Sequence, residues 1–238
     1  MKLFAALVLL SLFVSQINAS AYLFVVHGVS NFGGNTNVHV NVNGGRAISN
    51  FVYGTSAGYI PVSAGSTEIT VSLVNGGTTI INETVALTDG AYYTAVAVGS
   101  LNDSTTYPFR LLAVQINPSV FSNTMAKVAV FHTAPGAPNV DLYSGDSSLA
   151  NNLAYPSGVE LAEVSATTYN LSLRLASDPS QVALAIGNTE LQGGKVNYFF
   201  ALGDIVGGET LSVRNIQPAE DEPSPASTAV PFWLSLFF

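Results

Sequence analysis

Residues 54–58 read Gly-Thr-Ser-Ala-Gly, the G-x-S-x-G pattern that surrounds the nucleophile of many serine hydrolases. In those enzymes the serine lies between a strand and a helix, and backbone amides beside it stabilise the oxyanion. Here Gly58 is followed by Tyr-Ile-Pro-Val, which favours a second strand over a helix. We therefore interpret the segment as a β-turn between two strands, with a secreted hydrolase that uses Ser56 as the alternative.

Histidine is the other residue type that could do chemistry, and two of the three histidines end matching apolar segments. His27 follows AYLFVV and precedes a Gly/Asn-rich loop, whereas His132 follows AKVAVF and precedes TAPGAP. One interpretation is a metal ligand or general base, with His27 and His39 as the best pair. The recurrence favours the other interpretation, in which each imidazole orders the loop that follows. Asp141, which stands where His39 stands in the first segment, is expected to be a further loop-ordering residue.

Other kinds of site are disfavoured by composition. The chain has no cysteine, which excludes thiol nucleophiles, thiolate metal sites and disulfides. Charged residues make up 9% of the sequence and the net charge is −8, so a basic surface for nucleic acid is not expected. Gly-rich turns such as residues 33–34 lack the Lys-Ser/Thr of a phosphate loop, and we expect no cofactor.

The N-terminus has the features of a secretory signal peptide. Lys2 is followed by a short apolar run and then by small residues, which predicts a leader over residues 1–19 that is too short to span a bilayer. We therefore expect a secreted or cell-surface protein. Three N-x-[ST] sequons are candidate glycosylation sites, of which the first two have turn-like, polar neighbours: Asn82, Asn102 and Asn170.

The elements that must position these residues are strands. Segments such as TEITVSLV and YNLSLRLA alternate apolar and polar residues, and Gly/Asn/Asp clusters separate them. We find no convincing helical periodicity after residue 20. The predicted fold class is all-β, and short strands at regular intervals favour antiparallel β-sandwiches.

Self-comparison shows that the chain repeats. The segment around His27 matches that around His132, Tyr53 matches Tyr155, and a Gly-bounded aromatic strand recurs with the same spacing of glycines. The order of the blocks is kept, which predicts two tandem domains. The predicted limits are residues 20–117 and 126–217, with 118–125 as the linker.

The residues KVAVFHTAPGAPNVDLY and LAYPSG resemble the family catalogued as domain of unknown function 4397. The resemblance covers nearly all of residues 21–217. It implies exported, often tandem, immunoglobulin- or transthyretin-like sandwiches without an assigned activity. The first repeat departs from the pattern, because His39 replaces the aspartate and a Gly/Asn loop replaces the Pro loop.

Residues 218–238 begin as an acidic Pro/Ser-rich linker and end in an apolar tail that holds the only Trp. Three interpretations stay open: a glycosylphosphatidylinositol (GPI) anchor signal, a tail that folds back on the sandwich, and a segment that docks to a partner. The membrane is expected as a partner only through such an anchor.

The sequence favours a non-enzymatic extracellular module with binding or structural function over an enzyme. The expected partner is an extracellular protein or glycan, contacted through the loops that follow the two histidine-ending segments or through an exposed strand edge. The candidate binding residues in these loops are Asn31, Asn35, Pro135 and Pro138.

Overall fold

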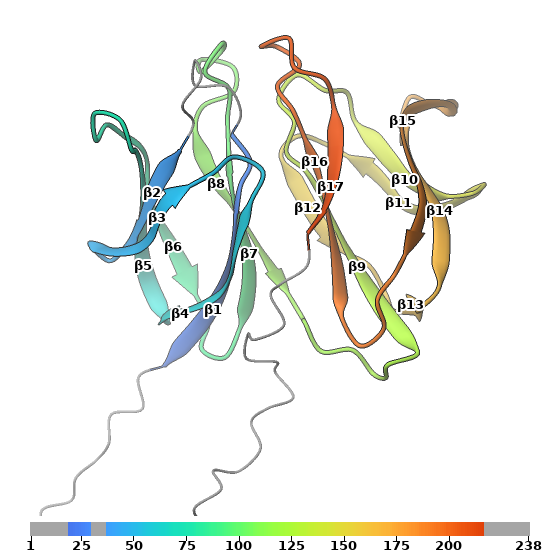
Figure 1. The fold of residues 1–238 in the computed structure, drawn as a ribbon, viewed down its shortest axis with the longest axis horizontal. Helices are drawn as coiled ribbons and strands as arrows, with labels where there is room; N and C mark the ends of the chain where they lie inside the picture. The colour runs from blue at the N-terminus through green and yellow to red at the C-terminus, as the bar shows by residue number, and fades with distance from the viewer. Residues whose placement is uncertain (1–18, 30–36, 217–238) are drawn as a thin grey trace, which may run out of the picture.

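The computed structural model describes residues 19–29 and 37–216, and these form two β-sandwiches with no helix among them. The predicted leader, the apolar tail, Asn31 and Asn35 lie outside the described residues. The prediction of an all-β fold in two tandem domains is confirmed. Figure 1 shows the domains side by side, with their sheets arranged as four successive layers.

The first domain contains eight strands: β1 (Ser20–His27), β2 (Val38–Val42), β3 (Gly45–Phe51), β4 (Ser56–Ser63), β5 (Gly65–Leu73), β6 (Thr79–Leu87), β7 (Tyr92–Val98) and β8 (Arg110–Ile116). Its inner sheet, which faces the second domain, has the order β4-β1-β7-β8, and its outer sheet has the order β3-β2-β5-β6. The apolar residues between the two sheets form the core of this domain.

The second domain repeats this order with one short additional strand. Its strands are β9 (Met125–His132), β10 (Val140–Ser144), β11 (Ser147–Leu153), β12 (Ser157–Glu160), β13 (Val164–Ser165), β14 (Thr168–Leu175), β15 (Asp178–Glu190), β16 (Val196–Leu202) and β17 (Ser212–Ile216). The inner sheet is β12-β9-β16-β17 and the outer sheet is β11-β10-β14-β15, and β13 pairs with β9. Each strand of the first domain thus has a counterpart in the second.

Strand pairing is antiparallel except for one pair in each inner sheet. β1 pairs in parallel with β7, and β9 pairs in parallel with β16. In these pairs His27 stands opposite Ala97, and His132 stands opposite Ala201. The four strands therefore finish at one end of the molecule, the upper end in Figure 1, which we call the loop end.

The two inner sheets also pack against each other, and this contact forms a third apolar core, which we call the seam. Its buried residues are Phe24, Val26, Tyr59, Val96, Val98, Ile116, Ala129, Phe131, Val196, Tyr198, Phe200 and Leu202. Because the inner sheets are covered on both faces, β16 is buried along its whole length, and all its residues except Asn197 are apolar or aromatic.

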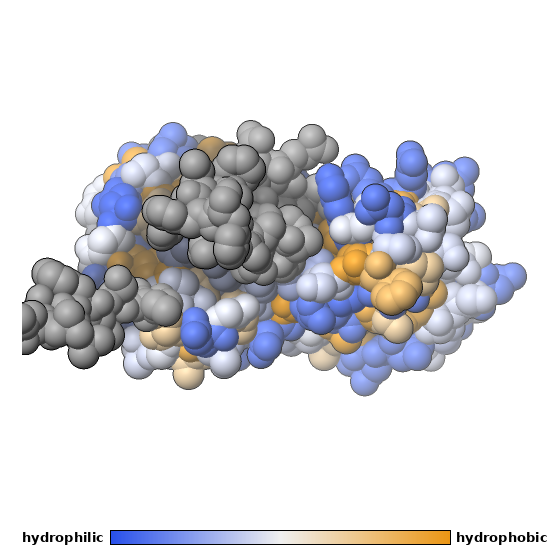
Figure 2. Space-filling view, turned by 90° about the horizontal axis from the view of Figure 1, so that it is seen from below, coloured by the Kyte–Doolittle hydropathy of each residue, from blue (hydrophilic) through white to orange (hydrophobic). Residues whose placement is uncertain are grey.

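Residues 117–124 join the two domains at the end opposite the loops. The backbone N–H of Asn117 donates to Glu160, and Lys127 donates to the Asn117 carbonyl while it forms an ion pair with Glu160 at 3.2 Å. Figure 2 shows this end, where hydrophobic residues gather over the second domain. Phe121 of the connecting segment is 91% exposed.

Candidate functional site

Ser56 does not lie in a nucleophile elbow. It is the first residue of strand β4 and pairs with Val26 of β1. The preceding segment is a β-turn in which the Thr55 N–H donates to the Val52 carbonyl at 3.1 Å and Gly54 has a φ of 70°. Because a strand follows the turn, there is no helix N-terminus beside the hydroxyl, and the turn agrees with the sequence interpretation.

His27 and His132 occupy equivalent, buried positions at the ends of β1 and β9. The Nε2 atom of His132 lies 3.0 Å from the carbonyl oxygen of Pro138. A carbonyl can only accept, so Nε2 carries the proton and the imidazole spans the loop that follows β9. Burial lowers the pKa of His132 below its usual range, which favours the neutral ring.

Each of these histidines packs edge-on against the tyrosine that recurs with it. The His27 ring lies 6.2 Å from the Tyr53 ring, and the His132 ring lies 6.3 Å from the Tyr155 ring, centroid to centroid. Both tyrosines then contact the other domain. The Arg214 guanidinium lies 5.8 Å from the Tyr53 centroid, and Tyr107 packs edge-on against Tyr155 at 5.5 Å. The repeated pair therefore links each loop to the neighbouring domain.

His39 and Asp141 act as equivalent backbone acceptors in the outer sheets. The Nδ1 atom of His39 accepts from the Asn50 N–H at 3.2 Å, and the Asp141 carboxylate accepts from the Asn152 N–H at 2.7 Å. Both asparagines have a φ slightly above 50°, at register shifts of the β2–β3 and β10–β11 ladders. Asp141 thus orders a β-bulge, and its predicted action on the loop is indirect, through the Asn139–Asn152 side-chain bond.

This arrangement does not favour the alternative of a His27/His39 metal site. His27 belongs to the inner sheet and packs against Phe51 and Tyr53, whereas His39 belongs to the outer sheet and accepts a backbone hydrogen bond. Within residues 19–29 and 37–216, no group of three or more histidine, aspartate or glutamate side chains is placed so that it could hold a metal ion.

The candidate binding residues of the second loop have different environments. Pro138 is exposed, and its carbonyl is the acceptor for His132. Pro135 is buried, and its carbonyl accepts from the Ile205 N–H at 3.0 Å. This position is a correction, because the loop 203–211 covers Pro135 and removes it from the surface that a partner could contact.

The three sequons are all exposed but differ in local structure. Asn82 lies within strand β6 and Asn170 within strand β14, both in outer sheets. The turn-like setting expected for Asn82 was wrong, because the local polar residues belong to the solvent face of a strand. Asn102 lies in the loop after β7, and its amide donates to the Asp204 carboxylate of the second domain at 3.3 Å.

Sequence reasoning missed a surface at the loop end. Four apolar side chains on the loops and turns there are between 39% and 46% exposed: Val52, Leu101, Ile205 and Val206. They come from both domains, and Leu101 and Ile205 directly follow Ser100 and Asp204, whose side chains are hydrogen-bonded across the seam at 2.7 Å. The only signal in the sequence was the presence of apolar residues beside Gly and Asn in segments 99–102 and 203–208. This pattern does not show that the two loops lie close together in space.

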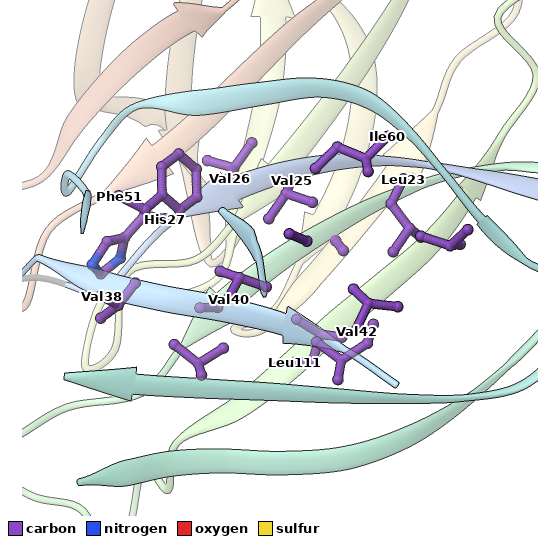
Figure 3. Close-up of a pocket in the computed structure, with 16 residues that line it drawn as sticks. Leu23, Val25, Val26, His27, Val38, Val40, Val42, Phe51, Ile60 and Leu111 are labelled. Carbon is purple, nitrogen blue, oxygen red and sulfur yellow. The ribbon is translucent and has the colours of Figure 1, made fainter. Parts of the chain in front are cut away.

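The interior of the first sandwich contains a narrow apolar cavity of about 20 Å³. Figure 3 shows aliphatic side chains of both sheets around it, among them Leu23, Val40 and Ile60, with His27 and Phe51 at one side. This volume is close to that of one water-sized probe. The cavity is therefore a packing gap and not a ligand pocket.

The fold and these loops define a tandem β-sandwich protein. The chain belongs to the family described as domain of unknown function (DUF4397), whose model matches residues 21–118 and 126–232. Comparison with curated proteins gave no match. Among the described residues, no helix is long and apolar enough to cross a membrane.

A similar solved structure is the crystal structure of CBMbc (family CBM26) from Eubacterium rectale Amy13K in complex with maltoheptaose. The sequence identity is 9%, the TM-score is 0.25, and the match covers 85% of this chain and 98% of that chain. A likeness at this level gives no information about a shared site.

Proposed function

We propose that this protein is an exported, non-enzymatic binding module whose two domains contact a partner together through the loop end. The observation that carries this proposal is the exposure of Leu101, Ile205 and Val206 on two loops, one from each domain, that are hydrogen-bonded to each other, with Val52 also exposed at the loop end. Exposed apolar residues that gather in this way are typical of interaction sites. Binding residues also occur most often on loops held by a rigid scaffold.

The scaffold here is rigid because the seam joins the domains into one body. Tyr59 and Tyr198 share a buried hydrogen bond across the seam, and Arg214 donates to the Gly54 carbonyl at 3.1 Å. Separating the domains would expose Phe24, Phe131 and Phe200 to water, which is strongly unfavourable. The spacing of the loops is therefore fixed before a partner arrives, and binding loses little conformational entropy.

The chemistry of the exposed residues favours a protein over a glycan as partner. The four side chains are aliphatic and carry no hydrogen-bonding groups, so they can gain free energy only by burial against another apolar surface. A nucleic acid is disfavoured by the net charge of −8. The features of residues 1–19 support export, and the GPI signal remains one interpretation of residues 218–238.

A capture experiment on native source cells tests the binding proposal. Immobilised full-length protein is compared with the double variant Leu101→Ser/Val206→Ser and with the control Val182→Ser, whose valine is exposed on β15 of the outer sheet, outside the loops that hold Leu101 and Val206. We expect extracellular proteins retained by wild type and control to fall at least about tenfold with the double variant. Equal capture by all three proteins would rule out the loop end as the binding surface. If the double variant instead lost binding to a purified glycan, the partner would be a glycan and not a protein.

Export and anchoring need a separate measurement. Terminal-peptide mass spectrometry of protein from its native cells is expected to find a chain that starts near residue 20. A lipid attached near the C-terminus would support the anchor, whereas a free Phe238 would exclude it. Retention of residues 1–19 would contradict export.

A further inference from the structure

The loops after β7 and β16 meet at one pair of equivalent residues. Gly99 and Gly203 each have a φ of 137°, which strongly favours glycine, and Ser100 and Asp204 follow them. The register makes these residues counterparts, since each lies three positions after the alanine that faces the histidine. Both residues are fully buried. The repeat has thus placed a donor on one domain and an acceptor on the other.

The Asp204 carboxylate gathers hydrogen bonds from both loops. One oxygen, Oδ2, accepts from the Ser100 hydroxyl at 2.7 Å and from the Asn102 amide at 3.3 Å. The other, Oδ1, accepts from the Gly207 N–H at 2.9 Å within its own loop. The Ser100 oxygen in turn accepts from the backbone N–H of Asn102 at 3.1 Å. The network therefore fixes the two loops to each other at their bases.

This carboxylate forms none of the ion pairs found in the described part of the chain. The ion pairs found there are Lys127–Glu160 and Arg174–Asp146. A buried charge that relies on neutral donors alone is costly compared with a neutral pair. The carboxylate accepts directional hydrogen bonds from several donors at once, and this specifies one relative position of the loops.

We propose that Asp204 is the positioning residue of the loop-end surface, an inference that rests on the proposed function. Through Ser100 and Asn102 it holds Leu101 of the first domain beside Ile205 and Val206 of the second, so that one partner meets both loops as one surface. Serine at both positions would lose the ionised acceptor, and aspartate at both would bring two buried carboxylates together. The difference between the repeats at this position therefore creates the bond.

Spin labels can measure the loop positions directly, because the chain has no native cysteine. The labels are attached at Thr105→Cys and Thr210→Cys. Both threonines are exposed, one lies in each loop, and neither substitution changes the apolar residues. We expect one narrow distribution of the distance between the two labels when Asp204 is unchanged. Asp204→Ala and Ser100→Asp should each broaden it at least about twofold, and the reciprocal pair Ser100→Asp/Asp204→Ser should narrow it again.

Capture of the partner, as described above, provides the second readout on the unlabelled variants. Capture should fall about tenfold for Asp204→Ala and recover substantially in the reciprocal pair, while Asp204→Asn provides a variant of nearly unchanged shape if the alanine variant folds poorly. An unchanged distance distribution in Asp204→Ala and Asp204→Asn would overturn the positioning role and leave the proposed function standing. A broadened distribution with full capture would also overturn it. If wild type captures nothing, the proposed function fails, and the partner-positioning role fails with it even if the distances change.

Discussion

The two inner sheets have the same strand order but present different faces to the seam. The second domain presents large rings at positions where the first domain has smaller residues: Phe131 corresponds to Val26, and Phe200 corresponds to Val96. Elsewhere the relation is reversed, because Phe24 corresponds to Ala129 and Tyr92 corresponds to Val196. If both domains presented the face of the second domain, Phe131 and Phe200 of one would meet the same rings of the other. The repeats therefore share a fold but are complementary partners, and this complementarity determines which surfaces meet.

The largest expected effect comes from removing a ring from the second face. Phe200 is fully buried, and its ring stacks on Phe131 at 4.9 Å. Phe200→Ala should lower the free energy of unfolding by about 3–5 kcal/mol, because it leaves a cavity among the rings of the seam, including Phe24 of the first domain. Urea denaturation measures this change, and the domains should then cease to unfold in one transition. Val182→Ala, at an exposed position, should change stability by less than about 0.5 kcal/mol.

A smaller effect is expected from the polar contact inside the seam. Tyr59→Phe removes the hydrogen bond that links the Tyr59 and Tyr198 hydroxyls across the domains. The loss should be about 1–3 kcal/mol in chemical denaturation, since a buried hydroxyl loses a partner while the ring volume is kept. An effect as large as that of Phe200→Ala would mean that polar bonds, and not ring packing, dominate the seam.

The histidine–tyrosine pairs provide a pH test of the second domain. Because burial lowers the pKa of His132 in the folded protein, the unfolded chain binds the additional proton more readily. Stability from this group is therefore present above the unfolded pKa of about 6.5 and is lost as the pH falls below it. The free energy of unfolding, measured by urea denaturation at about pH 8 and about pH 5.5, should fall less in His132→Gln than in wild type.

Removing the imidazole altogether tests its effect on the loop. His132→Ala should lower the melting temperature of the second domain, because the Pro138 carbonyl loses its donor. An unchanged melting temperature would contradict the loop-ordering role. Equal pH dependence of wild type and His132→Gln would assign the acid sensitivity to other groups.

The smallest effect is expected at Tyr155. Burial raises the pKa of its hydroxyl to about 12, and the oxygen has no hydrogen-bond partner of normal geometry among the described residues. Tyr155→Phe keeps the ring contacts with His132 and Tyr107, so stability should change by less than about 1 kcal/mol. A larger loss in thermal denaturation would show that this hydroxyl forms a bond that holds the domains together.

Much of the fold could be predicted from local patterns. Alternation predicted strands such as β5 and β14, because one face of each outer sheet contacts solvent. Self-comparison found the equivalence of His27 with His132, and the register confirms it. The seam could not be predicted. A strand buried on both faces, such as β16, has no alternation of apolar and polar residues, so its sequence does not show that one face contacts the other domain.

The candidate site was less accessible to sequence reasoning. Pro135 was expected at the surface because it lies in the loop that follows His132, but the loop after β16 covers it. The pair Ser100 and Asp204 was not identified at all, since each is an ordinary polar residue after a glycine and the two are 104 positions apart. Hydrogen bonds between domains depend on distance in space, which composition and spacing do not encode.

The sequence by itself determined an all-β chain of two related domains, because strand formation, turns and repetition depend on residues close together along the chain. Only the tertiary structure decided that the two inner sheets pack face to face, that each tyrosine of the His–Tyr pairs contacts the other domain, and that Asp204 joins the loops. These features arise from the complementarity of surfaces that are distant in sequence, and that complementarity exists only once both domains have folded.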